Sequence, residues 1–343
     1  MQLITRILPV GILVSLLIGC GYLYFNSYEL PHPDTASKKQ LGYWLATRDL
    51  EQSPHDIQIG LVNRLVNEPS LISSNGDDVK VPEKYAHRLK SNIEILKFVW
   101  FQDCVKKYHE LSHADQWMFL EKQIGVIENW AIITEQYSQV LYPDAPPDQD
   151  YSALLFDEVE LWLDKTPRDD HAAAYETVTD AIFCWLGTSS LTEQSMIARS
   201  ELASRITREL DSGTDIDSSV EFVPRKCVPM LVANTELLFE AWMHRVVSRF
   251  EKLESGPSRN EFADRLVEQV HGWGLLSTLA RLDSKTDKTN QGPTVEMAAA
   301  MKKFSHLVQS WADRAEPRTG ESMRELLATI KRRMLVKLFR VTK

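Results

Sequence analysis

Two stretches of the chain decide its fold, because they repeat each other. Residues 81–111 read VPEKYAHRLKSNIEILKFVWFQDCVKKYHEL, and residues 223–253 read VPRKCVPMLVANTELLFEAWMHRVVSRFEKL. The two stretches align without a gap from Val81/Val223 to Leu111/Leu253, and ten of the 31 aligned positions are identical. Such a long period indicates a domain-sized unit and excludes a short solenoid repeat. We therefore interpret the chain as the product of an internal duplication.

The tryptophans extend this repeat over most of the chain. Eight of the nine Trp residues fall into pairs that keep the same order in both halves, and only Trp117 has no partner. The pairs are Trp44/Trp185, Trp100/Trp242, Trp130/Trp273 and Trp162/Trp311. Two flanking motifs also match: WLATRDLEQS (44–53) with WLGTSSLTEQS (185–195), and WLDKTPR (162–168) with WADRAEPR (311–318). The predicted copies occupy residues 41–181 and 182–330.

The spacing of apolar residues within each copy is helical. The first copy has apolar residues spaced by four, four, four and three positions, and the second copy keeps them all apolar. These positions are Leu96, Trp100, Cys104, Tyr108 and Leu111, matched by Leu238, Trp242, Val246, Phe250 and Leu253. One apolar stripe at this spacing is typical of an amphipathic helix. We predict an all-α protein with two tandem copies of an antiparallel helix-hairpin unit, four or five helices in each.

Start and stop signals fit this helical prediction. Ser53 to Asp56 has the pattern of a capping box, with Pro54 at the first helical position. The segments 142–150 and 284–294 contain Pro or Gly and are predicted breaks between helices at equivalent places.

Some polar residues also survive in both copies. They are Arg64/Arg205, Asn92/Asn234, Glu94/Glu236 and Asp164/Asp313. Our preferred interpretation is structural, with each residue making an ion pair or hydrogen bond that fixes helix register within its copy. The alternative is a pair of equivalent ligand sites.

The N-terminus carries an apolar segment. Leu8 to Phe25 contains no charged residue and is just long enough to form a transmembrane helix. We predict an anchor or signal segment at 1–28 and a linker at 29–40. The charge bias across the segment is small and favours a single-pass anchor with the bulk of the chain outside the cytoplasm. A cleaved secretory signal and a lipoprotein acylated at Cys20, within LIGC (17–20), are the alternatives.

The other cysteines do not form a metal or redox motif. Cys104, Cys184 and Cys227 are far apart in the sequence, with no C-x-x-C pair. Cys104 aligns with Val246 and Cys227 with Tyr85, so we interpret these cysteines as buried packing residues.

The charge of the chain bears on its partners. A formal net charge of −9 argues against a nucleic-acid partner, because phosphate contacts need clustered Lys and Arg. The C-terminal segment 331–343 nevertheless carries six positive charges and no acid. We predict a basic amphipathic tail that rests on an anionic membrane surface or packs on the body of the protein.

The repeated stretch of the first copy runs into HELSH (109–113), a match to the zinc-protease pattern H-E-x-x-H. In the zincin metalloproteases, which this stretch resembles, His109 and His113 would bind zinc from one helical face and Glu110 would be the general base. Ser112 to Asp115, however, has the pattern of a capping box that starts a new helix. The second copy has Gly256-Pro257 just beyond the equivalent position, which predicts a break here too. We therefore expect no metal and no catalytic residue at this stretch.

Together these features predict a membrane-tethered, extracytoplasmic helical binding or scaffold protein. Its predicted partners are the lipid bilayer, through Leu8 to Phe25, and another protein. The alternative from a different class is a membrane-anchored zinc metallopeptidase centred on 109–113, with zinc as its cofactor.

Overall fold

The computed structural model describes residues 32–68, 83–141, 151–210, 223–254, 256–272 and 293–341. Within these ranges the chain forms eleven α-helices and two short 3₁₀ helices, with no β-strand, so the predicted all-α class is confirmed. None of the helices in these ranges is long and apolar enough to cross a membrane. The apolar segment Leu8 to Phe25, Cys20 and Trp273 lie outside the described residues.

The residues form two compact units. The first comprises 1–101 and 128–149, and the second comprises 102–127 and 150–343. The helices of the first half are α2 (Lys38–Thr47), α3 (His55–Asn67), α4 (Ala86–Glu110), α5 (His113–Leu141) and α6 (Tyr151–Lys165). The later helices are α7 (His171–Thr188), α8 (Met196–Leu210), α10 (Val228–Phe250), α11 (Pro257–Gly272), α13 (Pro293–Arg314) and α14 (Pro317–Val341). The unit boundaries fall inside the long helices α4 and α5, so one part of each helix belongs to the first unit and the other part to the second.

The core of the first unit lies where α2 and α3 meet α4 and α5. The rings of Trp100 on α4 and Trp130 on α5 lie 6.4 Å apart between centroids, and Trp130 is fully buried. Asn129 on α5 donates to the carbonyl oxygen of Val66 at the end of α3, which ties these two helices together.

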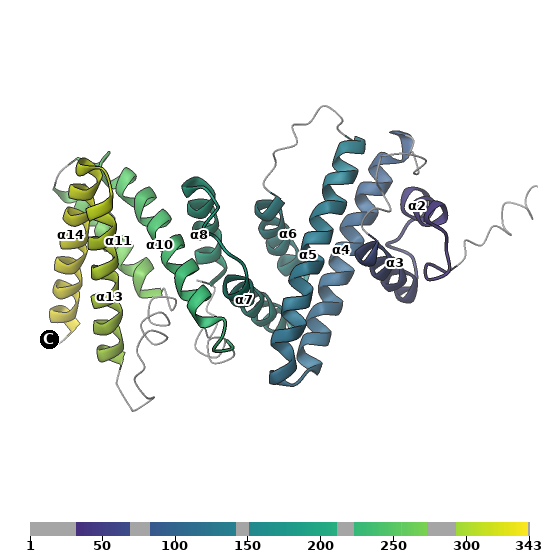
Figure 1. Ribbon diagram of the computed structural model, residues 1–343, viewed down its shortest axis with the longest axis horizontal. Helices are drawn as coiled ribbons and strands as arrows, with labels where there is room; N and C mark the ends of the chain where they lie inside the picture. Colours follow the sequence, from purple (N-terminus) through teal and green to yellow (C-terminus); the bar gives the residue numbers. More distant parts are fainter. Residues whose placement is uncertain are drawn as a thin grey trace, which may run out of the picture. The chain divides into compact units, whose positions relative to one another are not determined.

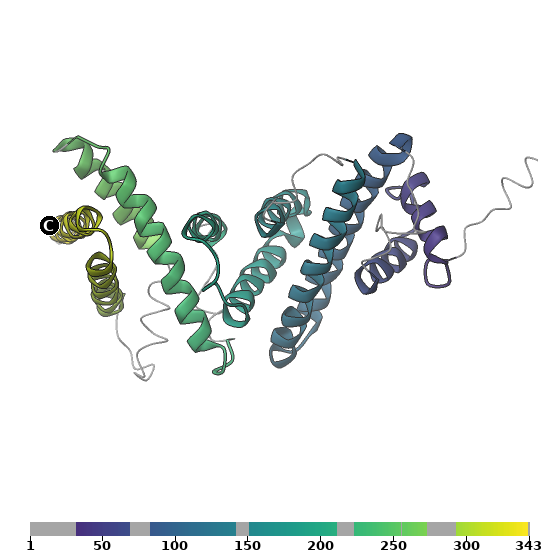
Figure 2. The ribbon, with the colours of Figure 1, turned by 45° about the horizontal axis from the view of Figure 1, so that its top comes forward.

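In the second unit α10 is the central helix. It packs against two helices that precede it in the sequence, α7 and α8, and against two that follow it, α13 and α14 (Figures 1 and 2). The helix α14 also packs against α11 and α13. Gly320 allows the close approach of α13 and α14, because a Cβ at this position would clash with the carbonyl oxygen of Ala312.

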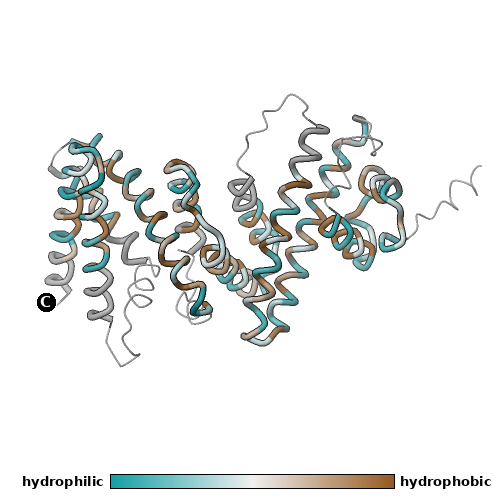
Figure 3. Tube along the Cα trace, viewed as in Figure 1, coloured by the Kyte–Doolittle hydropathy of each residue, from teal (hydrophilic) through white to brown (hydrophobic). Residues whose placement is uncertain are grey.

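The predicted helical stripes are confirmed. The four stripe residues on α4 are buried, as are their four partners on α10, whereas Leu111 and Leu253 lie just beyond the helix ends and are half-buried. Apolar and polar residues alternate along the helices in Figure 3, as this one-sided burial requires. Trp100 and Trp242 are each 7% exposed, so the matched aromatics are equally buried.

The predicted capping box at Ser53 is wrong. Pro54 is the N-cap of α3, no side chain caps this helix, and Ser53 Oγ donates to the carbonyl oxygen of Asp49. A capping box occurs instead at the start of α2, where Ser37 and Gln40 bond reciprocally. Since α2 begins at Lys38, the last residues of the predicted 29–40 linker are helical.

Helix α7 contains the end of the first predicted copy and the start of the second. Its end carries Trp185-Leu186, which match Trp44-Leu45 on α2, and Pro167-Arg168 just before it match Pro317-Arg318 at the start of α14. The predicted boundary at 181/182 therefore falls inside a helix. Similarly, residues 331–341 of the predicted tail continue α14 without a break.

Candidate functional site

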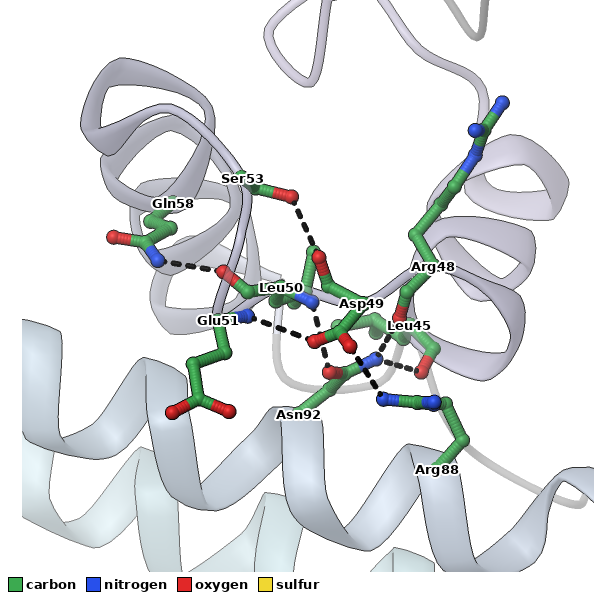
Figure 4. A network of polar contacts seen from close by, with 9 residues as sticks. All are labelled: Leu45, Arg48, Asp49, Leu50, Glu51, Ser53, Gln58, Arg88 and Asn92. Atoms are coloured by element: carbon green, nitrogen blue, oxygen red, sulfur yellow. Dashed lines mark hydrogen bonds and ion pairs between the residues drawn. The ribbon is translucent and has the colours of Figure 1, made fainter.

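Asn92 on α4 holds the turn between α2 and α3. Its amide nitrogen donates to the carbonyl oxygens of Leu45, at 2.8 Å, and Arg48, at 2.7 Å. Its amide oxygen accepts from the backbone N–H of Leu50 at 3.2 Å. Figure 4 shows this buried amide beneath the turn, where Arg88 of the same helix also pairs with Asp49 at 3.2 Å. Two of the bonds satisfy carbonyl oxygens that the end of α2 leaves open, and the third satisfies an N–H group of the turn.

Asn234 on α10 makes the same three contacts with the turn after α7. Its amide nitrogen donates to the carbonyl oxygens of Leu186, at 2.8 Å, and Ser189, at 2.5 Å. Its oxygen accepts from the backbone N–H of Leu191 at 3.1 Å. The structural interpretation of the Asn92/Asn234 pair is therefore confirmed, because both amides are used within the chain.

The other shared polar residues also make contacts within the chain. Arg64 donates to the carbonyl oxygens of Pro33, Asp34 and Ala36, each at 3.2 Å, and pairs with Glu68. Arg205 pairs with Glu201 at 3.2 Å, Glu94 with Lys97 at 3.2 Å and Glu236 with Lys303 at 3.5 Å. Asp313 pairs with Arg324, whereas Asp164 is exposed. The ion pairs thus differ in detail between the halves, while the asparagine contacts are the same.

The HELSH stretch spans a turn between two helices, as predicted. Helix α4 ends at Glu110 and α5 begins at His113, so His109 and His113 lie on different helices. His109 Nε2 lies 3.0 Å from the carbonyl oxygen of Ala173, and His113 Nδ1 lies 2.9 Å from Gln116 Oε1. The second half breaks at the equivalent place, where Gly256 has a φ of 102°. The two imidazoles do not share the helical face that the zincin pattern needs.

The contacts of Ser112 differ from those of the predicted capping box. The Ser112 hydroxyl donates to the Asp115 carboxylate, with 2.5 Å between Oγ and Oδ2. The first turn of α5 is closed by backbone bonds from Asp115 and Gln116 to the Ser112 carbonyl oxygen. In the parts of the chain that the structure describes, no group of three or more His, Cys, Asp or Glu residues is arranged to hold a metal ion.

A buried polar pair lies beside this turn. Tyr108 on α4 donates to Asp180 on α7, with 2.5 Å between its hydroxyl and Oδ2, and both side chains are buried. Burial and the hydrogen bond to Asp180 raise the pKa of Tyr108 well above its ordinary value. Thr177 Oγ1, one turn before Asp180, lies 3.3 Å from His109 Nε2. Sequence reasoning missed this pair, although an Asp within the apolar run TVTDAIFCWL was a signal of it.

The three described cysteines are buried free thiols, as predicted. Burial raises the pKa of Cys104 and Cys227, and raises that of Cys184 to about 12. A thiol with a raised pKa is a poor nucleophile at neutral pH, because the thiolate is the reactive form. These cysteines therefore serve as packing residues.

An open groove of about 480 Å³ lies between α8 and α10. Met196, Ile197 and Ala241 provide its apolar lining, and Glu201, His244 and Arg245 provide its charged or titratable lining. Ile197 is 80% exposed. Sequence reasoning did not identify this groove, because its two walls come from separate helices and periodicity reports on one helix at a time.

Comparisons of the chain with protein-family models, with curated proteins and with solved structures give no match.

Proposed function

We propose that the protein is a membrane-tethered helical scaffold that binds another protein outside the cytoplasm. In this proposal Leu8 to Phe25 holds the chain to the bilayer as a single-pass anchor, and two duplicated sets of helices form the scaffold. The length and apolar character of that segment support the tether. Acylation at Cys20 is the alternative means of attachment.

The observation that carries the scaffold proposal is the pair of asparagine networks. Asn92 and Asn234 bond to the same three backbone groups in two turns at matched places in the sequence, namely Leu45/Leu186, Arg48/Ser189 and Leu50/Leu191. Unrelated helical folds have no reason to share a buried three-bond contact at matched sequence positions. The networks therefore support the internal duplication on which the scaffold proposal rests.

The geometry at HELSH favours the scaffold over the zinc peptidase. A catalytic zinc site needs three protein ligands in fixed positions, with two of them one turn apart on a single helix in the zincin pattern. Here the helix ends between the two histidines, and each ring contacts a protein oxygen atom.

The test is chemical crosslinking in intact membranes followed by solubilisation and purification of the full-length chain. We expect one protein to be recovered at a ratio near one to one, and we expect the chain itself to stay with the membranes after a carbonate wash. A chain that begins after residue 25 and washes off would contradict the tether. Stoichiometric zinc that is lost in His109→Ala would contradict the scaffold and favour the peptidase.

A further inference from the structure

The groove between α8 and α10 can be compared with the matched surface of α3. We align α8 with α3 at the same residue offset that matches Trp185 with Trp44. In this alignment the buried residues of α8 fall at the positions of the buried residues of α3. The matched buried pairs are Leu61/Leu202, Val62/Ala203 and Leu65/Ile206. These buried pairs, together with Arg64/Arg205 at the same offset, set the register of the two helices without use of the groove residues.

This register shows which groove residues the fold does not require. Met196 and Ile197 on α8 correspond to His55 and Asp56 on α3, and both of the α3 residues are exposed polar side chains. A helix in this position therefore folds with polar residues at its exposed start. Ile197 is 80% exposed, and the matched residue Asp56 is polar, so the start of the helix does not require an apolar side chain at this position. Met196 and Ile197 are adjacent exposed apolar side chains that line the same groove. An apolar lining with a few polar groups is typical of binding pockets.

The charges of the groove indicate the chemistry of this partner. Glu201 is paired with Arg205 at 3.2 Å, so its negative charge is compensated within α8. Arg245 is exposed and donates to Ser204 Oγ at 2.6 Å, a contact that leaves its positive charge uncompensated because a hydroxyl is neutral. His244 lies beside Arg245 in the same wall. The groove thus combines an apolar lining with one guanidinium, that of Arg245, which makes its contact with a hydroxyl and not with a carboxylate.

We propose that this groove binds a short segment of a partner protein that carries apolar side chains next to Asp or Glu. The apolar side chains would cover Met196 and Ile197, and the carboxylate would pair with Arg245, whose guanidinium suits bidentate contact with a carboxylate. This proposal rests on the scaffold function and specifies the site and the partner chemistry.

The experiment measures fluorescence anisotropy of labelled synthetic peptides with the full-length chain in lipid nanodiscs. The probe is a short synthetic peptide of Leu, Phe, Asp and Glu. One control peptide has Lys in place of the acids, and another has Ser in place of Leu and Phe. We expect saturable binding of the acidic apolar peptide alone, with a Kd on the order of 10–100 µM, the range of a small interface.

Substitutions locate the binding. Ile197→Asp installs the kind of residue that α3 carries, and we expect it to weaken binding by about tenfold, as loss of a central contact does. Arg245→Glu should weaken the acidic peptide similarly and strengthen the lysine peptide. Met118→Asp is the matched control, because Met118 is 63% exposed on α5, and it should leave binding unchanged. All three side chains are exposed, and unchanged circular dichroism melting curves verify that the variants fold.

Several results would overturn the groove proposal. They are no binding up to roughly 1 mM peptide, equal binding of acidic and lysine peptides, and a change below about twofold in Ile197→Asp. The crosslinking experiment separates this failure from failure of the scaffold proposal. A partner recovered equally well with wild type and Ile197→Asp contradicts the groove alone, whereas no partner with either chain contradicts the scaffold.

Discussion

The C-terminal ends of α4 and α10 occupy matched places in the chain but have opposite chemistry. On α4, Tyr108 bonds to the buried Asp180 of α7. The residue of α10 that matches Tyr108 is Phe250. Aligning Pro167 with Pro317 places Ile330 of α14 at the position of Asp180. Both residues of the second pair are buried. One set of helices thus folds with a buried hydroxyl and carboxylate, and the other with two hydrocarbon side chains.

This difference separates the residues that define the helical frame from those that modify it. Asn92 and Asn234 keep the same contacts in both sets of helices, and Trp100 and Trp242 keep the same burial. The Tyr108–Asp180 bond occurs in one set only, so we expect the helical frame not to depend on it. Buried polar pairs are often no more stabilising than apolar residues of similar volume, although breaking one partner is costly.

The largest effect should come from the matched tryptophans. Trp100→Ala and Trp242→Ala each remove a side chain that is 7% exposed, and we expect a loss of about 3–5 kcal/mol in the free energy of unfolding. Urea denaturation followed by circular dichroism measures this loss. A loss below about 1 kcal/mol for either variant would show that the two positions are not equivalent.

The asparagine networks should give the next largest effect. Asn92→Ala and Asn234→Ala each remove three bonds and leave buried backbone groups unsatisfied, so we expect about 2–4 kcal/mol for each. Asn63→Ala on α3 is the control, since Asn63 is exposed, and it should change stability by less than about 0.5 kcal/mol. Strongly unequal losses for Asn92 and Asn234 would break the comparison between the two turns.

We expect a double variant to show that the fold does not require the Tyr108–Asp180 pair. Tyr108→Phe leaves Asp180 without its hydroxyl partner, and we expect a loss of about 1–3 kcal/mol. Adding Asp180→Ile installs the residues of the second set, and we expect it to recover most of this loss. The measurement is again equilibrium unfolding in urea. A double variant less stable than Tyr108→Phe would show that the first set requires the polar pair.

The same pair predicts a dependence of stability on alkaline pH. The pKa of Tyr108 is raised in the folded protein above the ordinary value near 10, so the protonated form favours folding. Its contribution is fully present below about pH 10 and is lost as pH rises toward the folded pKa, by up to about 1.4 kcal/mol per pH unit. Melting curves at mildly to strongly alkaline pH should therefore show a shallower decline for Tyr108→Phe than for wild type.

The smallest effect should be at HELSH. His113 is exposed and contacts Gln116 on its own helix, so we expect His113→Ala to change stability by less than about 0.5 kcal/mol. Elemental analysis of the purified protein should show no stoichiometric zinc, in wild type or variant. One equivalent of zinc in the wild type would contradict this expectation.

The helices were predictable from sequence because their signals are local. The apolar stripe through Leu96 and Trp100 needs only the spacing of residues along one helix. The matched Gly256-Pro257 break predicted the turn at HELSH. The start of α3 was misjudged, because a Ser followed three residues later by an acid describes composition, whereas the cap depends on the direction of the hydroxyl.

Contacts between distant residues could not be predicted in this way. Tyr108 and Asp180 are 72 residues apart, and their bond depends on how α7 packs against α4. The sequence repeat gives some information about contacts between distant residues, because a residue shared by both halves is a candidate for the same contact in each. The repeat identifies Asn92 and Asn234 as shared residues from sequence alone, but it gives no indication of features that only one half has.

The asparagine networks also protect two backbone amides in turns, and we expect these amides to exchange slowly with solvent. The N–H groups of Leu50 and Leu191 bond to side-chain oxygens and belong to nearly inaccessible residues, although both residues lie between helices. Turn amides ordinarily exchange rapidly with solvent deuterium, while these two can exchange only when α4 or α10 releases its asparagine. Leu50 lies in the first unit and Leu191 in the second, so a deuterium-exchange time course at these two amides records the opening of each unit separately.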